Sequence, residues 1–183
     1  MSGPDTTDAL CRHVALQAFG TKTALRLMPG AQRDSLLRAM ARGIRDAAPQ
    51  IIDANGRDLE AGAALGSAMI DRLRLDFPRI AAMADAVEAI ARQPDPVGRI
   101  EDGRTLPNGI RLEKRRVPIG VVLVIYESRP NVTSDAAALC LKAGNSVVLR
   151  GGKEAAHSNR AIIQAMRPAL AAVATPAEAA PMA

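Results

Sequence analysis

Apolar side chains recur every three to four positions through the first hundred residues. This spacing occurs in DALCRHVALQAF, DSLLRAMARGI and RIAAMADAVEAIAR, and it is typical of amphipathic helices that bury one face. A Pro-rich connection at 93–98 closes the series, and three turn-forming pairs are predicted to separate the helices: Pro29-Gly30, Asn55-Gly56 and Gly66-Ser67. We therefore expect an amino-terminal helical segment over residues 1–101.

The pattern then changes to short runs that alternate apolar with polar residues. In TLPNGIRLEKRRVPIG the pair Asn108-Gly109 lies between two such runs, which predicts a β-hairpin over residues 102–117. This pair suits the positive φ angles of a type I′ turn. The basic residues 114–116 are most simply part of one exposed strand, and a contact with a partner subunit or an anionic ligand is the alternative.

From Pro118 onward the apolar runs become continuous. IGVVLVIY and SVVLR predict strands, and each is followed by a helical pattern, in NVTSDAAALCLKAG and EAAHSNRAIIQAMRPALAAV. This order is typical of an α/β fold in which a parallel sheet is covered on both faces and adjacent strands are joined by a right-handed crossover. Because a stable sheet normally has more than two strands, we expect residues 118–183 to be a truncated part of a larger α/β domain.

Composition and charge exclude several classes of protein. The 183 residues are 48% hydrophobic, 23% charged and 2% aromatic, as in a soluble globular protein whose core is aliphatic. The net charge is +5, but arginines alternate with acids through residues 33–79 and few rings are present for stacking, so a nucleic-acid partner is not expected.

Compartment and metal chemistry follow from similar arguments. The opening MSGPDTTDAL lacks the features of a signal peptide, and VVLVIY is too short to span a membrane, so we expect a cytoplasmic protein without a membrane partner. The two cysteines form neither a disulfide framework nor a zinc site. The sequon at Asn131 to Thr133 then carries no glycan, and no metal site is expected.

Polar residues follow both predicted strands at their carboxyl ends, which is where open α/β sheets bind ligands. The first strand is followed by Tyr126, Glu127, Ser128, Arg129 and Asn131, and the second ends in Arg150 before Gly151, Gly152, Lys153 and Glu154. Arg150, Lys153 and the loop amides suit an anion such as phosphate. The alternative is that RGGKE is a solvated turn and ESRP a capped strand end. Neither GxGxxG nor GxxxxGK[ST] is present.

Long motifs resemble one family. PIGVVLVIYESRPNVTSDAAALCLKAGNSVVLRGGKEAAHSN is similar to the γ-glutamyl phosphate reductases, or glutamate-5-semialdehyde dehydrogenases, of the aldehyde dehydrogenase superfamily, and SAMIDRLRLD and TLPNGIRLEKRRVPIG extend the resemblance. It implies an aldehyde dehydrogenase-like fold, of which the amino-terminal helices, a hairpin and the first βαβα half of the parallel cofactor-binding sheet are expected here. The implied activity is the NADPH-dependent reduction of γ-glutamyl phosphate to glutamate-5-semialdehyde and phosphate in proline biosynthesis.

The resemblance also implies roles for residues and partners. Arg150 would contact the adenosine ribose or its phosphate, and Gly151, Gly152, Lys153 and Glu154 would continue that cofactor loop. The segment from Tyr126 to Asn131 would pass between nicotinamide and the reacting carbonyl, with Arg129 on an anionic substrate group. Ser128 would lie near the oxyanion that forms from the reacting carbonyl, but the hydrogen-bond donor to that oxyanion stays unassigned. A homo-oligomer and a functional association with glutamate 5-kinase are also implied for the full-length family.

The catalytic nucleophile of this superfamily is a cysteine thiolate, and the resemblance places it downstream, in a catalytic domain that we expect to be absent. Cys140 and Cys11 are predicted to lie on core faces of helices, where cysteine acts as a small hydrophobe. His13 and His157 are expected at helix surfaces or ends. We therefore expect no catalytic residue in this chain and no activity from it alone. The alternatives are a short, non-catalytic binding or assembly module of the same fold and a basic nucleic-acid binder.

Overall fold

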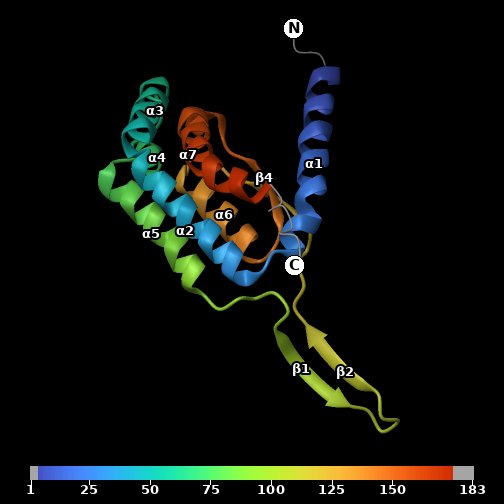
Figure 1. The fold of residues 1–183 in the computed structure, drawn as a ribbon. Coiled ribbons are helices and arrows are strands. Elements are labelled where there is room, and N and C mark those ends of the chain that lie inside the picture. The colour runs from blue at the N-terminus through green and yellow to red at the C-terminus, as the bar shows by residue number, and fades with distance from the viewer. Residues whose placement is uncertain (1–3, 175–183) are drawn as a thin grey trace, which may run out of the picture.

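The computed structural model describes residues 4–174. Figure 1 shows a group of packed helices, a long helix α1 beside them and a hairpin that extends away from both. The helical segment contains α1 (Pro4–Leu27), α2 (Gly30–Asp46), α3 (Ala48–Ala61), α4 (Ser67–Leu73) and α5 (Phe77–Arg92). The hairpin follows as β1 (Ile100–Thr105) and β2 (Arg111–Arg115), and the α/β part as β3 (Val121–Ile125), α6 (Asn131–Lys142), β4 (Ser146–Arg150), a 3₁₀ turn η1 (Lys153–Ala155) and α7 (Ala156–Ala174).

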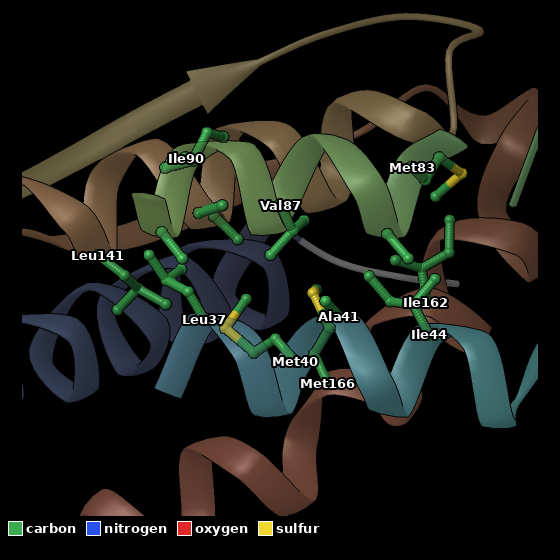
Figure 2. Close-up of a cluster of buried hydrophobic side chains, with 14 of the residues drawn as sticks. Leu37, Met40, Ala41, Ile44, Met83, Val87, Ile90, Leu141, Ile162 and Met166 are labelled. Atoms are coloured by element: carbon green, nitrogen blue, oxygen red, sulfur yellow. The ribbon is translucent and has the colours of Figure 1, made fainter. Parts of the chain in front are cut away.

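Helix α2 is the centre of the core. It packs against both α5 and α7, and Figure 2 shows its side chains meeting those of α5, α6 and α7. Leu37 and Ile44 of α2, Val87 of α5 and Ile162 of α7 are completely buried. Each such side chain contributes about 1.5–3 kcal/mol when it leaves water. The apolar periodicity of DSLLRAMARGI and RIAAMADAVEAIAR therefore predicted that α2 and α5 each bury one face.

Helix α1 departs from this pattern. Leu25 near its end is buried, but Leu10, Leu16 and Phe19 are more than half exposed, and Cys11 is exposed. The expectation that Cys11 lies on a core face was wrong, because the described residues place no neighbouring element over the first turns of α1. The helix is tied to β4 near its end, where Thr21 Oγ1 lies 2.8 Å from Ser146 Oγ.

Helix α3 runs through Asn55-Gly56, so the predicted turn at this pair was wrong. The Asn55 side chain is buried, where it donates to Leu73 O at 2.8 Å and accepts from Leu75 N at 2.7 Å. It also donates to Ser158 Oγ at 3.0 Å. These bonds provide partners for the backbone polar groups of Leu73 and Leu75, where α4 ends. Such tertiary contacts outweigh the weak helix propensities of Asn and Gly.

Three further buried polar side chains join elements that are distant in sequence. Asp58 of α3 accepts from the backbone N–H groups of His157 and Ser158 at 3.1 and 2.8 Å, and so caps the first turn of α7. Arg33 of α2 forms an ion pair with Asp95, between Nη2 and Oδ2 at 2.6 Å, which fixes the connection after α5. Lys142 Nζ lies 2.5 Å from Asp34 Oδ1 and donates to Ala91 O at 3.0 Å, which ties α6 to α2 and α5.

The predicted hairpin is present, but its turn is not type I′. Strands β1 and β2 pair antiparallel, and Gly109 N donates to Leu106 O at 2.9 Å. Gly109 has a φ of 84°, and no non-glycine residue in the described chain has a positive φ, whereas a type I′ turn needs positive φ at both central residues. Pro107 supplies the negative φ that starts an ordinary type I turn, so Gly109 takes the left-handed position after it.

Strands β3 and β4 pair in parallel, in the register Val121 to Ser146 through Ile125 to Arg150. This confirms the prediction that the two strands are parallel and adjacent. The right-handed crossover between them stays a prediction. Val147 and Leu149 of β4 pack against the helical core. Leu123 and Ile125 of β3 are 60% and 67% exposed, so one face of the strand is open in the described residues.

We predict that Asn55→Ala lowers the free energy of unfolding by about 2–3 kcal/mol, because it leaves the backbone groups of Leu73 and Leu75 buried without partners. The measurement is urea denaturation followed by far-ultraviolet circular dichroism. Gln50→Ala on the exposed side of α3 is the matched control and should change the free energy by less than about 0.5 kcal/mol. Equal effects of the two changes would contradict the anchoring role of Asn55.

Candidate cofactor and substrate site

The two loops predicted to carry the site leave the sheet at the same edge. Ile125 and Arg150 are partners in the last register pair of β3 and β4, and Tyr126 N donates to Arg150 O at 3.1 Å one step further. Residues 126–131 then lead into α6, and residues 151–154 lead into η1 and α7. The structure therefore brings both predicted loops to one rim, at the carboxyl ends of parallel strands.

A chain of hydrogen bonds fixes Tyr126 at this rim. Its Oη lies 2.6 Å from Thr133 Oγ1, and the Thr133 hydroxyl donates to Asn159 Oδ1 at 3.0 Å. Because the Thr133 proton is directed to Asn159, Thr133 accepts from the Tyr126 hydroxyl. Burial raises the pKa of Tyr126 and the bond to Thr133 opposes that rise, so the phenol stays protonated at neutral pH and joins β3, α6 and α7.

Gly151 is enclosed by the same network. A Cβ atom at this position would lie 2.2 Å from Asn159 Nδ2 and 3.2 Å from Tyr126 Cε2. The first distance is far below van der Waals contact, and the Asn159 side chain is fixed by its bond to Thr133. Glycine is therefore required here by the close approach of the buried Asn159 and the partly buried Tyr126, and no positive φ is involved.

Ser128 and Glu154 connect the two loops directly. The buried Ser128 hydroxyl donates to Glu154 Oε1 at 2.8 Å. The pKa of Glu154 is held below its usual range, first by a hydrogen bond from its own backbone N–H and then by the bond from Ser128. The carboxylate also covers Gly152, since a Cβ there would lie 2.2 Å from Oε1.

This arrangement differs from the phosphate cradle that we expected from the loop amides. The amide of Glu154 already bonds to a carboxylate that is charged at neutral pH, and a phosphate at that amide would meet a like charge. The free acceptor positions of the carboxylate instead suit the hydroxyl donors of a ribose. Exposed Arg150 and Lys153 remain as cations at the rim.

The other predicted residues of the first loop do not act together. Glu127 and Arg129 have exposed side chains, and Arg129 N donates to Glu127 O at 2.5 Å in a tight turn. Asn131 instead donates to Asp135 Oδ2 at 3.0 Å within α6. It also lines a hollow shared with residues of α4 and α5. The structure thus assigns Asn131 to a different surface from the Ser128–Glu154 pair.

Neither thiol has the environment of a nucleophile. Cys140 is half-buried, and burial raises the pKa of its thiol, which lowers the thiolate fraction at neutral pH. Cys11 is exposed on α1, away from the strand ends. Among residues 4–174, no group of three or more His, Cys, Asp or Glu side chains could hold a metal ion. The side chains of His13 and His157 are exposed, as expected.

Two residues of the rim were missed in the sequence. In the sequence, Thr133 stands out only as part of a glycosylation sequon, and Asn159 lies in a helical pattern that does not indicate its role. Both are buried polar residues on the inward faces of helices that follow the strands. A polar side chain at an otherwise apolar helix position was the available signal, because buried polar groups need hydrogen-bond partners.

Comparison with known proteins identifies the family of the chain. The model of the aldehyde dehydrogenase family matches residues 2–179, and the chain belongs to that family. A probable aldehyde dehydrogenase from Listeria monocytogenes shares the fold, with a TM-score of 0.65 at 16% identity over 91% of this chain and 34% of that one. Membership in this family implies a nicotinamide cofactor. Arg150 and Lys153 suit the phosphates of such a cofactor, and the Glu154 carboxylate suits its ribose hydroxyls.

More similar relatives carry one name. A γ-glutamyl phosphate reductase from Geobacter sp. strain M21 is 50% identical over 92% of this chain and 41% of its own length. The crystal structure of the γ-glutamyl phosphate reductase from Thermotoga maritima superposes with a TM-score of 0.84 and 35% identity, over 87% of this chain and 39% of that one. The chain thus spans about two fifths of the length of these relatives. In its described part, no helix is both long and apolar enough to cross a membrane.

We predict that Gly151→Ala destabilises the protein by about 1–3 kcal/mol, because the new methyl group forces Asn159 or Tyr126 out of place. Urea denaturation measures the change. Gly56→Ala is the control, since a Cβ there meets nothing within 4 Å and alanine in a helix is favoured over glycine by about 1 kcal/mol. If Gly151→Ala proved as stabilising as Gly56→Ala, the close approach at the rim would be wrong.

We also predict that Ser128→Ala raises the pKa of Glu154 while leaving it below the usual value of ~4.3, since the backbone bond remains. A carboxyl with a lowered folded-state pKa stabilises the fold above its unfolded pKa and loses that effect as the pH falls through the folded value. The measurement is a carbon-detected NMR titration of Glu154 between about pH 6 and pH 2. Ser35→Ala on α2 should leave the titration unchanged, and an unchanged Glu154 in Ser128→Ala would contradict the pairing.

Proposed function

We propose that this chain supplies the cofactor-binding rim of a γ-glutamyl phosphate reductase. The observation that carries the proposal is the meeting of residues 126–131 and 150–154 at one edge of the β3–β4 pair. The relatives with 50% identity over most of the chain bear the name of this enzyme. In this proposal γ-glutamyl phosphate takes up a hydride from NADPH and a proton, and gives glutamate-5-semialdehyde, NADP and phosphate.

The roles at the rim follow from charge and hydrogen-bonding capacity. NADPH supplies the hydride. Glu154, held charged by its own amide and by Ser128, accepts hydrogen bonds from ribose hydroxyls. Arg150 and Lys153 are the cations that bind the additional phosphate of NADPH. Two positive side chains beside a ribose site favour NADPH over NADH, because only NADPH carries that phosphate. Arg129, exposed on the other loop, contacts the anionic phosphate of the substrate.

Acyl transfer needs a thiolate within bonding distance of the carbonyl. The chain contains two cysteines, and Cys140 is half-buried with a raised pKa while Cys11 lies on α1. We therefore expect the nucleophile of the proposed enzyme outside these 183 residues, and no turnover by this chain alone. The proposal retains a helical segment at 1–101, a hairpin at 102–117 and a cofactor-binding part at 118–183.

The remaining parts of the proposal concern the setting of the enzyme. A cytoplasmic homo-oligomer is expected, with glutamate 5-kinase as the activity that supplies the acyl phosphate for proline biosynthesis. A second candidate is a non-catalytic assembly module, which the exposed Leu123 and Ile125 of β3 favour because they form an open apolar strand face. Such a module would bind a partner polypeptide and would not respond to NADPH.

We predict that turnover requires a second polypeptide and depends on Arg150. The chain is mixed with the part of the Geobacter relative that lies beyond the matched region, and the reverse reaction is followed at 340 nm with glutamate-5-semialdehyde, phosphate and NADP. Arg150→Gln should raise the KM for NADP about tenfold or more, the cost of a lost charge-assisted hydrogen bond, and should change the KM for phosphate less.

Arg38→Gln, an exposed arginine on α2, is the control and should leave both KM values unchanged. Turnover by the chain alone, lost in Cys140→Ala, would overturn the placement of the nucleophile. Binding of the second polypeptide without any turnover or NADPH binding would favour the assembly module instead.

A further inference from the structure

A hollow of about 260 Å³ lies between the first turn of α6, the end of α4 and the start of α5. Three arginines line it, Arg72, Arg74 and Arg79, together with Asn131 and Asp135, and part of its wall is apolar. Arg72 and Arg74 belong to SAMIDRLRLD, a motif that the cofactor rim does not use. The hollow therefore combines a strong positive charge with one carboxylate, beside the loop assigned to the substrate.

Two of the three arginines of this hollow, Arg72 and Arg74, are available for an anion, whereas Arg79 is already paired with Asp71. Arg72 and Arg74 alternate with the buried Leu73 and Leu75, so the packing of the two leucines fixes the backbone from which the exposed arginines project. No hydrogen bond or ion pair of either guanidinium occurs within the described part of the chain. Arg79 is oriented by Asp71, with 2.6 Å between Nη2 and Oδ1, and by the carbonyl of Arg74 at 2.9 Å.

Asp135 provides the opposite charge. Its Oδ2 accepts from Asn131 Nδ2 at 3.0 Å, whereas its Oδ1 is buried and has no hydrogen-bond partner in the part of the chain that the structure describes. A buried carboxylate oxygen without a donor is costly. Because the last torsion of an aspartate side chain is soft, a small rotation can present this oxygen to a donor in the hollow.

We propose that this hollow recognises the α-amino-acid end of the substrate, with the arginines binding its α-carboxylate and Asp135 its α-ammonium group. The inference rests on the proposed function and specifies its substrate site. Asn131 follows directly on the loop assigned to the reacting carbonyl, so a glutamyl chain with its γ-carbonyl at that loop has its zwitterionic end available for the hollow. Arginine suits a carboxylate because its fork donates two parallel hydrogen bonds.

The charges predict a definite selectivity. A ligand with both an α-carboxylate and an α-ammonium satisfies the arginines and Asp135 together. Glutarate lacks the ammonium and brings only anionic groups next to Asp135, while γ-aminobutyrate lacks the α-carboxylate and leaves the arginines unpaired. L-Glutamate should therefore bind more tightly than either analogue, by about tenfold for one charge-assisted hydrogen bond.

The experiment measures binding of L-glutamate, glutarate and γ-aminobutyrate to the 183-residue chain by saturation-transfer NMR, without cofactor. Arg72→Gln should raise the Kd for L-glutamate about tenfold. Asp135→Asn should remove the preference for L-glutamate over glutarate while glutarate binding is kept or improved. Arg38→Gln is the matched control and should bind as the unchanged chain does. Circular dichroism confirms that each variant is folded, and the exposed position of Arg72 makes its replacement compatible with folding.

Three outcomes would overturn the inference. These are equal binding of L-glutamate and glutarate to the unchanged chain, displacement of L-glutamate by an equal concentration of inorganic phosphate, and an Asp135→Asn chain that keeps its selectivity. Phosphate displacement would show a general anion site in place of an amino-acid site. Since the measurement needs neither NADPH nor turnover, its failure is distinct from a failure of the proposed reductase activity.

Discussion

The parallel, in-register pairing of β3 with β4 is the constraint on which the site depends. It ends both strands at the pair Ile125 and Arg150, and so the loops that follow must share one edge of the sheet. The Ser128–Glu154 bond then joins those loops, and the chain from Tyr126 through Thr133 to Asn159 ties both to the helices behind them. A slip of one residue would separate these partners and turn the buried faces of the strands outward.

The helices hold this small sheet in place through a few buried polar groups. Asn55 and Asp58 of α3 reach the start of α7, and Lys142 links α6 to α2 and α5. Each is satisfied by partners from another element, so the loss of one partner leaves a buried group unpaired, which costs more than the bond itself contributes. The main apolar core surrounds α2 (Figure 2), whereas these polar groups specify which helix ends meet at the rim.

The sequence predicted what periodicity and chain order determine, namely the helices, the hairpin, the two parallel strands and the edge where their loops meet. It did not predict what depends on tertiary contacts. Asn55-Gly56 has the composition of a turn but lies within α3, because Asn55 bonds to the chain beyond α4. The amides of the loop after β4 were expected to hold an anion such as phosphate, yet the Glu154 amide bonds to the carboxylate of its own residue. The arginine hollow joins α4, α5 and α6, and no local pattern shows that these residues meet.

The most direct test of the account is an amide chemical-shift map of the labelled 183-residue chain, recorded with NADPH and separately with L-glutamate. We expect two separate sets of perturbed amides. NADPH should shift residues 126–128 and 150–154, even if it binds weakly, and L-glutamate should shift residues 72–79 and 131–135. The hairpin of β1 and β2, which extends away from the helices (Figure 1), should be unaffected by either ligand. Shifts from NADPH in the hairpin or α1 and none at 150–154 would contradict the placement of the cofactor at the β3–β4 rim.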